Sequence, residues 1–478
     1  MHGEFWRSQA LNDLMPLWFE HVIDREHGGF FLNLSRDWQP RAPWEKAPPM
    51  LSRQVYTFSA AFLLSGDEKY LAVARDGADY VIEHAWDAEY GGWFDRITET
   101  GEPLLTTKSV PEQLYTGVGL TLYAFTTGDE RVLSYVQRGD EIRSKQAHDP
   151  VFGGYYEALN RDLSVLDPGK NKHAHFGYVS SLVLNLYLAT RDPAVLAWEE
   201  ELTDLSLDRM RDAEGWIHGW PDRFDRRWNL LPVLAGGKQL VAVGAQLTAS
   251  LSFLRLFHQS GKDRYRQAGE ALGNLVTQWG FNPETGAWTD FVEALPPHKP
   301  IVSADSGSAG GYYQQLSGPS ISWWVQIYGA FLQLQLFRVT GNPACLENFR
   351  KTEEFFLRHF VDHEYGGVFA TVSAKGELIG DGAKASDWHA SYHEIEHGLL
   401  NYLYLNLYVE RKPARLFFRS DGRGGKRFVS LVDDPAVTIA GVTIDGRPWA
   451  DFNAAERSVT LPVRGESFTF EVTFAPAP

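Results

Sequence analysis

The sequence DREHGGF at residues 24–30 is the first copy of a pattern that decides the fold of this chain. The pattern is an aspartate, three further residues, a glycine and a nearby aromatic residue. Close copies follow at 87–93 and 149–155, and looser copies start at 212, 282 and 362. The repeated glycines stand at 28, 91, 153, 215, 286 and 366, so the steps between them are 63, 62, 62, 71 and 80 residues.

A second marker lies between the copies of the first. Each example follows a long apolar stretch, and the five are Gly66–Asp67, Gly128–Asp129, Arg191–Asp192, Gly261–Asp263 and Gly341–Asn342. Apolar residues at helical spacing predict one helix over 55–64, with a glycine stop at Gly66, and a second over 70–81. Two interlocked periods indicate one structural unit used six times. The sequence therefore predicts an all-α fold, an (α/α)6 barrel of six helical hairpins with its pocket at one end of the inner ring.

The character of the sequence changes near residue 412. Short alternating runs such as 437–444 and 468–472 are separated by turn residues, for example Asp445–Gly446, and this pattern is typical of strands. We therefore expect two domains, a barrel at 1–411 and a small antiparallel β module at 412–478. The β module is expected to act as a structural lid or an interface.

The amino-acid composition of the chain argues against some classes of binding partner. The chain has 478 residues, a net charge of −16 and a single cysteine, Cys345. An acidic chain without a Lys/Arg cluster repels nucleic acid and anionic lipid, and no stretch is apolar enough for a membrane span. The lone cysteine and the absence of a signal sequence favour the cytoplasm. Aromatic residues make up 14% of the chain and suit either a core or a sugar-binding site.

Two helix starts carry polar side chains that could act on a ligand. Arg53 precedes an apolar helix, where its guanidinium can bind sugar hydroxyls or an enediolate, although a solvated helix end is an equal alternative. Asn171 and His175 are four residues apart and share one face of the third inner helix. An isolated histidine is more often structural than catalytic, and its place at the expected cavity improves the case for function.

Residues 387–397 form the segment richest in candidate catalytic groups. His389, His393 and His397 recur every four residues on one helical face, with Glu396 adjacent. Histidine transfers protons near neutral pH, which favours acid/base catalysis. A metal site is the minority hypothesis because the spacing is not that of an HExxH helix. A glycosidase would instead need two carboxylates facing each other across a cleft, and the sequence does not show which would pair.

Taken together, these features resemble the N-acylglucosamine 2-epimerase family, which includes aldose–ketose isomerases and cellobiose 2-epimerases. The resemblance covers roughly residues 1–410. It is carried by RQVYTF at 53–58, Lys108 with Glu112–Gln113, Asn171 to His175, SWWVQ at 322–326, YGG at 365–367, and Trp388 to His393.

The resemblance implies an (α/α)6 barrel and proton transfer at C2 of a reducing sugar without a consumed cofactor, although some epimerases of the family need a nucleotide as activator. It implies that His393 is a catalytic histidine and that Arg53 holds substrate oxygens. We also expect His175 and Glu396 in the catalytic set. The remaining expected substrate-binding residues are Tyr56, Asn171, Trp324, Gln326, Trp388 and His397.

The sequence departs from the family pattern at three places. The family's other catalytic histidine lies in a Gly-His-x-x-Glu stretch, and the matching segment here, 244–248, has Ala245 and Thr248 in place of the histidine and the glutamate. Tyr328 replaces a usual glutamate, and Glu396 replaces an expected arginine. Loss of a general base typically lowers the rate by factors of about 100 to 10,000. A two-histidine mechanism therefore needs a substitute such as His175, His397 or Glu396.

Three functions remain open from the sequence. The first is an isomerase or epimerase acting on a free sugar or short saccharide. The second is a hydrolase or lyase on the same barrel, and the third is a non-catalytic saccharide-binding protein. The expected ligand in each case is a carbohydrate, and a homodimer is expected only by analogy with relatives.

Overall fold

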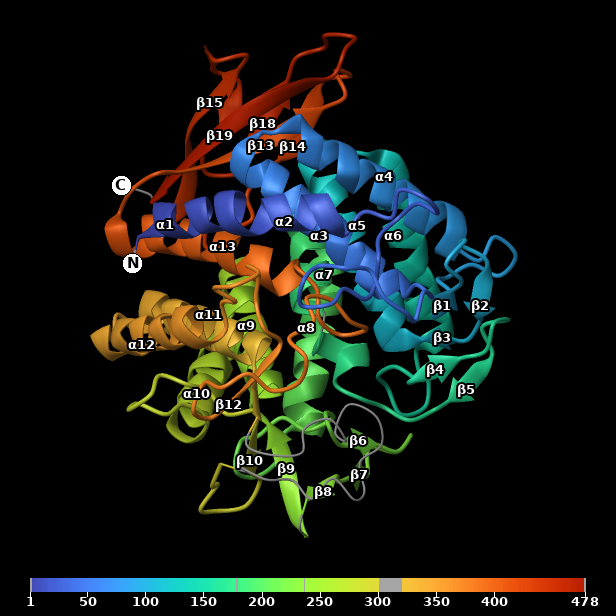
Figure 1. Ribbon diagram of the computed structural model, residues 1–478, viewed down its shortest axis with the longest axis vertical. Helices are drawn as coiled ribbons and strands as arrows, with labels where there is room; N and C mark the ends of the chain where they lie inside the picture. The colour runs from blue at the N-terminus through green and yellow to red at the C-terminus, as the bar shows by residue number, and fades with distance from the viewer. Residues whose placement is uncertain (1, 178, 236, 301–319, 477–478) are drawn as a thin grey trace.

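The computed structural model describes residues 2–177, 179–235, 237–300 and 320–476, and it is mostly helical with several small antiparallel sheets (Figure 1). Six helices contact one another in a closed ring, each touching the next and the last touching the first. In ring order they are α3 (Pro48–Ser65), α5 (Val110–Thr127), α7 (Val179–Thr190), α9 (Val243–Ser260), α11 (Trp323–Thr340) and α13 (Tyr392–Tyr404).

Five ring helices pair with the helix that follows them in the chain. These partners are α4 (Glu68–Ala85), α6 (Glu130–Ile142), α8 (Pro193–Leu205), α10 (Asp263–Gly280) and α12 (Pro343–His359). Short π-helical segments extend several helices: η2 (Arg143–Ala147), η3 (His173–Gly177), η4 (Ser206–Met210) and η6 (Leu405–Glu410).

The sixth pair differs from the predicted consecutive hairpin because the two ends of the helical region form it. α13 contacts the N-terminal helix made of α1 (Gly3–Ser8) and η1 (Gln9–Leu14), which continues into α2 (Met15–His21). The first copy of the glycine pattern follows α2, so the chain starts with an outer helix and only later supplies its ring partner. This pairing places the N-terminal helix beside α13, which ends at Tyr404.

Each copy of the repeat has the same local structure. Gly66, Gly128, Gly261 and Gly341 end their helices in the left-handed conformation that the predicted glycine stops require, and Arg191 adopts it in the third unit at φ 55°. Each glycine loop is closed by an antiparallel bridge: Ile23–Phe30, Trp86–Trp93, His148–Tyr155, Arg211–Ile217, Phe281–Trp288 and Val361–Val368.

A buried ion pair recurs behind four of these loops and was not predicted. The repeated aspartate pairs with a lysine 21 or 22 residues later: Asp24–Lys46 at 2.8 Å, Asp87–Lys108 at 3.1 Å, Asp149–Lys170 at 3.2 Å and Asp362–Lys384 at 2.7 Å. Breaking a buried pair leaves an uncompensated charge, so these lysines hold the loops against the ring.

Further short strands accompany the loops. They are β1 (Arg96–Ile97), β2 (Pro103–Leu105), β3 (Lys108–Ser109), β4 (Ala158–Leu159), β5 (Val165–Asp167), β6 (Arg223–Phe224), β7 (Leu230–Leu231), β8 (Leu234–Ala235), β9 (Lys238–Ala242), β10 (Phe291–Glu293), β11 (Ser320–Ser322) and β12 (Thr371–Ser373). Their sheets contain two or three strands, in the orders β1-β2, β3-β4-β5, β6-β7, β10-β9-β8 and β11-β12.

The C-terminal strands form two antiparallel sheets with the orders β13-β19-β15-β16 and β14-β18-β17. The strands are β13 (Ala414–Ser420), β14 (Gly425–Phe428), β15 (Val437–Ile444), β16 (Arg447–Trp449), β17 (Phe452–Asn453), β18 (Ser458–Leu461) and β19 (Phe468–Pro476). The predicted boundary between 411 and 412 falls in the connection between η6 and β13.

This β module lies against one end of the ring, at the top of Figure 1. β13 contacts α3 and α5, and β14 contacts α7. Gly66 packs so closely on Phe417 that a Cβ atom at this position would lie 2.8 Å from the ring.

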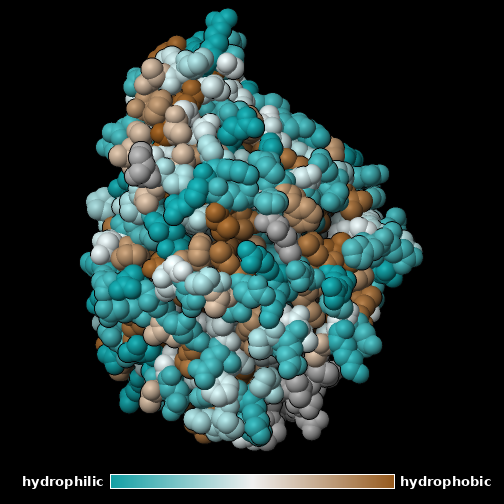
Figure 2. All heavy atoms as spheres, turned by 90° about the vertical axis from the view of Figure 1, so that its left-hand side faces the viewer, coloured by the Kyte–Doolittle hydropathy of each residue, from teal (hydrophilic) through white to brown (hydrophobic). Residues whose placement is uncertain are grey.

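No described helix is both long and apolar enough to cross a membrane. The face drawn in Figure 2 is mainly hydrophilic, with smaller hydrophobic areas near its middle.

Candidate functional site

A pocket lies where the ring helices begin, at the end of the ring away from the β module. All six ring helices, or the residues just before them, contribute to its wall. Its volume is about 250 Å³, near the small end of the range of about 300 to 1,000 Å³ for ligand sites. The described lining residues are Arg53, Tyr115, Val118, Lys172, His173, Trp220, Ala245, Thr248, Trp323, Trp324, Tyr328, Trp388, Tyr392 and His393.

His393 stands in the first turn of α13 and presents its ring to this pocket. Its ring centroid is 6.3 Å from that of Trp324, in a stacked arrangement, and 5.3 Å from that of Tyr328. Burial, together with the nearby charge of Arg53, lowers the pKa of His393 well below its usual value. The imidazole is therefore neutral at pH 7 and can accept a proton from a bound ligand.

Arg53 is held in place on the pocket wall by aromatic rings and a backbone carbonyl. Its Nη1 donates a hydrogen bond of 2.9 Å to the carbonyl oxygen of Trp388. Its guanidinium carbon lies 4.2 Å from the centre of the Tyr115 ring and 5.7 Å from that of Tyr392. A fixed, permanently charged fork of donors at a pocket suits the binding of oxygen atoms.

Glu396 lies one turn further along α13, beneath the pocket lining. Its carboxylate accepts hydrogen bonds from the hydroxyls of Tyr328, at 3.1 Å, and Tyr392, at 3.3 Å. Its Oε2 is 3.6 Å from Nδ1 of His393. Burial raises the pKa of Glu396 to about 7. Glu396 therefore positions Tyr328 and Tyr392 from behind, with its carboxylate beside His393.

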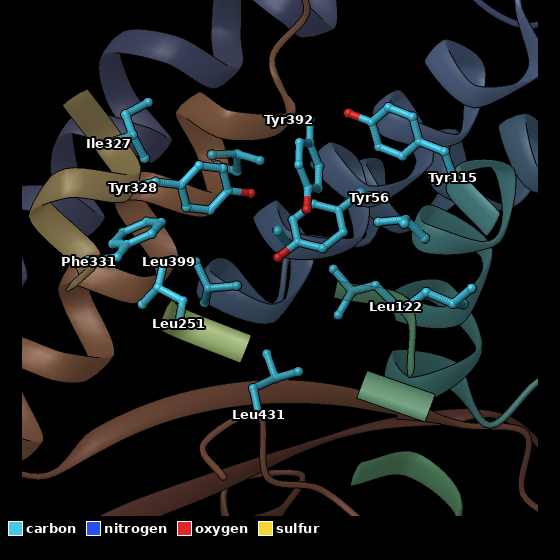
Figure 3. Packing of buried hydrophobic residues seen from close by; sticks show 14 of the residues in the cluster. Tyr56, Tyr115, Leu122, Leu251, Ile327, Tyr328, Phe331, Tyr392, Leu399 and Leu431 are labelled. Carbon is cyan, nitrogen blue, oxygen red and sulfur yellow. The ribbon is translucent and has the colours of Figure 1, made fainter. Parts of the chain in front are cut away.

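Figure 3 shows the aromatic layer that contains Tyr328 and Tyr392. Tyr56, Tyr328 and Tyr392 turn their hydroxyl ends toward the space between them, and Leu431 of the β module lies below. Tyr56 was predicted to bind substrate, but it is buried in this layer and lines a separate small cavity together with Leu431. Tyr56 thus lies beneath the pocket and not on its wall.

His175 does not line the pocket either. It is fully buried, its Nδ1 donates to the carbonyl oxygen of Asn171 at 2.6 Å, and its Nε2 accepts from the backbone N–H of Tyr155 at 3.1 Å. A Cβ atom on Gly154 would lie 2.6 Å from that Nε2, which explains the need for glycine there. Both ring nitrogens are used, and burial lowers the pKa of His175 to about 3.

Three glutamines perform the role of His175 in other units. Gln113 clasps the backbone N–H and carbonyl of Trp93 at 2.6 and 2.7 Å, and Gln246 does the same at Ile217 at 2.9 and 2.8 Å. Gln326, predicted to bind substrate, makes this clasp at Trp288 with distances of 2.7 and 2.9 Å. The structure thus gives Gln326 and His175 a repeated role in holding the glycine loops.

The other two predicted binding residues also lie outside the pocket. The Asn171 side chain accepts from the N–H of Ala174 at 2.8 Å at the start of η3. His397 pairs through Nε2 with Glu353 at 2.8 Å behind α13. Of the ten predicted site residues, the pocket brings together four: Arg53, Trp324, Trp388 and His393. The described residues contain no group of three or more potential ligands that could hold a metal ion.

Comparisons with known proteins show what this chain is similar to. A sequence model of the family described as N-acylglucosamine 2-epimerase matches residues 28–246. A cellobiose 2-epimerase from Bacteroides fragilis is 28% identical over 411 residues, covering 81% of this chain and 95% of the relative. The matched model and the relative support assignment of this chain to the N-acylglucosamine 2-epimerase family.

Two solved structures show the same fold. The cellobiose 2-epimerase from Bacillus thermoamylovorans B4167 superposes with a TM-score of 0.72 at 19% identity, covering 84% of this chain and 98% of that one. A D-mannose isomerase superposes with a TM-score of 0.70 at 16% identity, covering 84% and 97%. These similarities extend well beyond residues 28–246.

Sequence reasoning missed several pocket residues. Lys172 and His173 precede the third ring helix, Trp220 follows the fourth glycine loop, and Tyr115 lies on α5. Alignment of the repeated units would have distinguished Lys172 from the structural lysines, because the lysine at the repeated position of its unit is Lys170. Ala245 and Thr248, where the sequence departs from the family pattern, both line the pocket.

Proposed function

We propose that this protein is a carbohydrate epimerase or aldose–ketose isomerase that acts at C2 of a free sugar or short saccharide. The proposal includes an (α/α)6 barrel, since the six ring helices close on themselves and their partners surround them. The observation that carries the mechanism is the neutral, pocket-lining His393 on a wall of tryptophans. Tryptophan faces suit the apolar faces of sugar rings.

In this mechanism His393 takes the C2 proton of the open-chain sugar, and the electrons of the C–H bond pass into an enediolate. Arg53 binds the oxygen atoms on which negative charge develops. The N-terminal ends of the ring helices face the same space, and their partial positive charge also stabilises an anion. Return of the proton to C2 on the opposite face gives the epimer, and its delivery to C1 gives the ketose.

The pocket wall gives less support to glycosidic cleavage. Hydrolysis usually requires two carboxyl groups on either side of the bond, about 5 to 9.5 Å apart. Among the described residues that line the pocket, none is aspartate or glutamate. Glu396 lies behind Tyr328 and Tyr392, where its carboxylate is occupied by their hydroxyls.

The experiment is proton NMR in D2O with glucose, mannose, fructose, N-acetylglucosamine, N-acetylmannosamine, cellobiose and mannobiose. We expect deuterium at C2 or C1 of at least one sugar, together with its epimer or ketose. Replacing His393 by Asn should lower this conversion by about 100- to 10,000-fold, as expected for loss of an acid/base group. His175→Gln is the matched control, because it changes a buried histidine outside the pocket.

Absence of exchange with every sugar, from folded protein, would overturn the proposal, and new reducing ends would establish cleavage in its place. Undiminished interconversion of the epimers, or of aldose and ketose, by His393→Asn would overturn the role of His393. Four further predictions rest on composition and resemblance: a cytoplasmic location, a homodimer, and no nucleic-acid or membrane partner. Gel filtration with light scattering measures the dimer directly.

A further inference from the structure

Lys172 is a buried lysine whose amino group lies on the pocket wall. The side chain is 2% exposed, and its Nζ donates a hydrogen bond of 2.7 Å to the hydroxyl of Thr248 on α9. Lys172 therefore reaches from the start of the third ring helix toward the fourth. Ala245, which also lines the pocket, has only a methyl side chain.

Lys172 differs from the lysines that the repeat uses for structure. Lys170, two residues earlier, pairs with Asp149 and belongs to the recurring loop contact. The three other units with this ion pair have Pro48, Val110 and Ser386 at the position of Lys172, two residues after their structural lysines. The lysine at 172 is thus an addition to the repeat, and it occurs where the pocket is.

The ring places Lys172 and His393 on opposite sides of the pocket. His393 is on α13, and Lys172 immediately precedes η3 and α7. In the closed ring, two helices separate α7 from α13 in either direction: α9 and α11 on one side, α5 and α3 on the other. A sugar bound between these walls has one face toward each group.

We propose that Lys172 is the second proton-transfer group of the site and acts at C2 on the face opposite His393. This inference rests on the proposed function. In one direction neutral His393 removes the C2 proton, and the ammonium of Lys172 donates a proton to the other face of the enediolate. In the reverse direction neutral Lys172 removes the proton, and the imidazolium of His393 donates. One proton is taken and one returned in each turnover, so no co-reactant is needed.

The electrostatics of Lys172 fit this role. Burial lowers its pKa to about 7, so both the acid and the base form are populated near neutral pH. The pKa of Lys170 is also lowered by burial, but the Asp149 carboxylate opposes this by stabilising its charged form. The charged form of Lys170 is thus stabilised for an ion pair, whereas Lys172 can exchange a proton near neutral pH.

The test follows C2 deuterium incorporation separately from each member of the epimer pair that the wild-type protein interconverts. Lys172→Met should lower interconversion by at least about 100-fold. It should keep exchange from one epimer only, the one that His393 deprotonates. His393→Asn should show exchange from the other epimer only. A purely structural role for Lys172 would lower exchange from both epimers together.

Lys170→Met is the matched control. It should lower the melting temperature, because it breaks a buried ion pair, but leave the ratio of exchange from the two epimers as in wild type. Interconversion by Lys172→Met within threefold of wild type would overturn the inference. The inference would also be overturned if His173→Gln, and not Lys172→Met, kept exchange from one epimer only. If wild type exchanges no sugar, the proposed function itself fails, which is a separate result.

Discussion

The two ends of the helical ring are built from the same six helices but serve different purposes. At the end where the helices begin, aromatic walls surround a pocket that holds His393 and Lys172. Where they finish, the β module covers the ring, and Leu431 lies under the aromatic layer (Figure 3). Both ends contain buried charges. At the covered end, Arg255 and Arg338 are paired with aspartates of the β module. In the pocket, His393 and Lys172 lie on the wall, where a ligand can contact them.

At the covered end, arginines of the ring helices pair directly with carboxylates of the β module. Asp433 accepts from Nε of Arg255 at 2.6 Å and from Nε2 of Gln259 at 2.6 Å, and Asp434 accepts from Nε of Arg338 at 2.6 Å. The backbone around these aspartates is held by Arg457, which donates to the carbonyl oxygen of Val432 at 2.7 Å. The comparison teaches that one repeated scaffold can use its helix ends for stability or for chemistry, depending on how charges are partnered.

Removing one partner at the covered end should have the largest effect on stability. We expect Asp433→Ala to lower the free energy of unfolding by about 3 to 5 kcal/mol, because the buried Arg255 guanidinium loses its carboxylate. Urea denaturation measures this change. The exposed pair Asp421–Arg423 in the same module provides the control, and Asp421→Asn should change stability by less than about 1 kcal/mol.

Asp433→Ala should leave sugar conversion within about twofold of wild type at temperatures where the protein is folded. The β module and the pocket are at opposite ends of the ring, so the lost ion pair should not reach His393. A drop of more than tenfold in folded protein would show that the covered end controls the pocket, and the contrast between the two ends would then fail.

Glu396, between the two ends, should give an intermediate effect that depends on pH. At pH 8, above its pKa of about 7, its carboxylate stabilises the imidazolium that His393 becomes during turnover. Glu396→Gln should lower kcat about tenfold there, since an opposite charge at this distance shifts a pKa by about 1 to 3 units. At pH 6 the wild-type Glu396 is largely protonated, and the two proteins should approach equal rates.

The kcat values of wild type and Glu396→Gln, measured from pH 6 to 8, test this contribution. Glu394→Gln is the control, because Glu394 is a buried glutamate of the same helix that accepts from Nε1 of Trp18 at 3.0 Å, outside the pocket. A ratio of wild-type to variant rate that is constant with pH would contradict an electrostatic role for Glu396.

How far the sequence predicts this molecule depends on the range of the interactions concerned. Local periodicity gave the helices, their glycine stops and the six loops, because these features depend on residues a few positions apart. The pairing of α13 with α1 and η1 depends on contacts across the whole chain, and the sequence analysis missed it. Arg53 and His393 were predictable because they begin ring helices in segments that resemble the family.

Side-chain direction explains most of the site residues that sequence reasoning misplaced. Asn171 and His175 do share a local segment, but their polar atoms turn to the backbone of that segment and of the glycine loop. Helical spacing places His397 on the same face as His393, yet about one turn of helix carries it past the pocket to Glu353. Lys172 was overlooked because it stands beside a lysine that the repeat explains.

The smallest expected effect comes from His175→Gln. Glutamines at 113, 246 and 326 clasp the loop backbone in other units with both amide atoms, so glutamine at 175 can accept from the Tyr155 N–H as histidine does. We expect a change in stability below about 1 kcal/mol and a kcat within twofold of wild type. His175→Ala, which leaves that buried N–H without its acceptor, should cost about 1 to 3 kcal/mol.

Thermal denaturation and sugar conversion of the two variants separate the structural role of His175 from the catalytic role that the sequence suggested. An acid/base group cannot be replaced by glutamine without a loss of about 100-fold or more, because an amide does not exchange protons near neutral pH. A stable but inactive His175→Gln would therefore return His175 to the catalytic set. An active one, beside an inactive His393→Asn, would show that equivalent positions in the ring keep the same structural task whether histidine or glutamine occupies them.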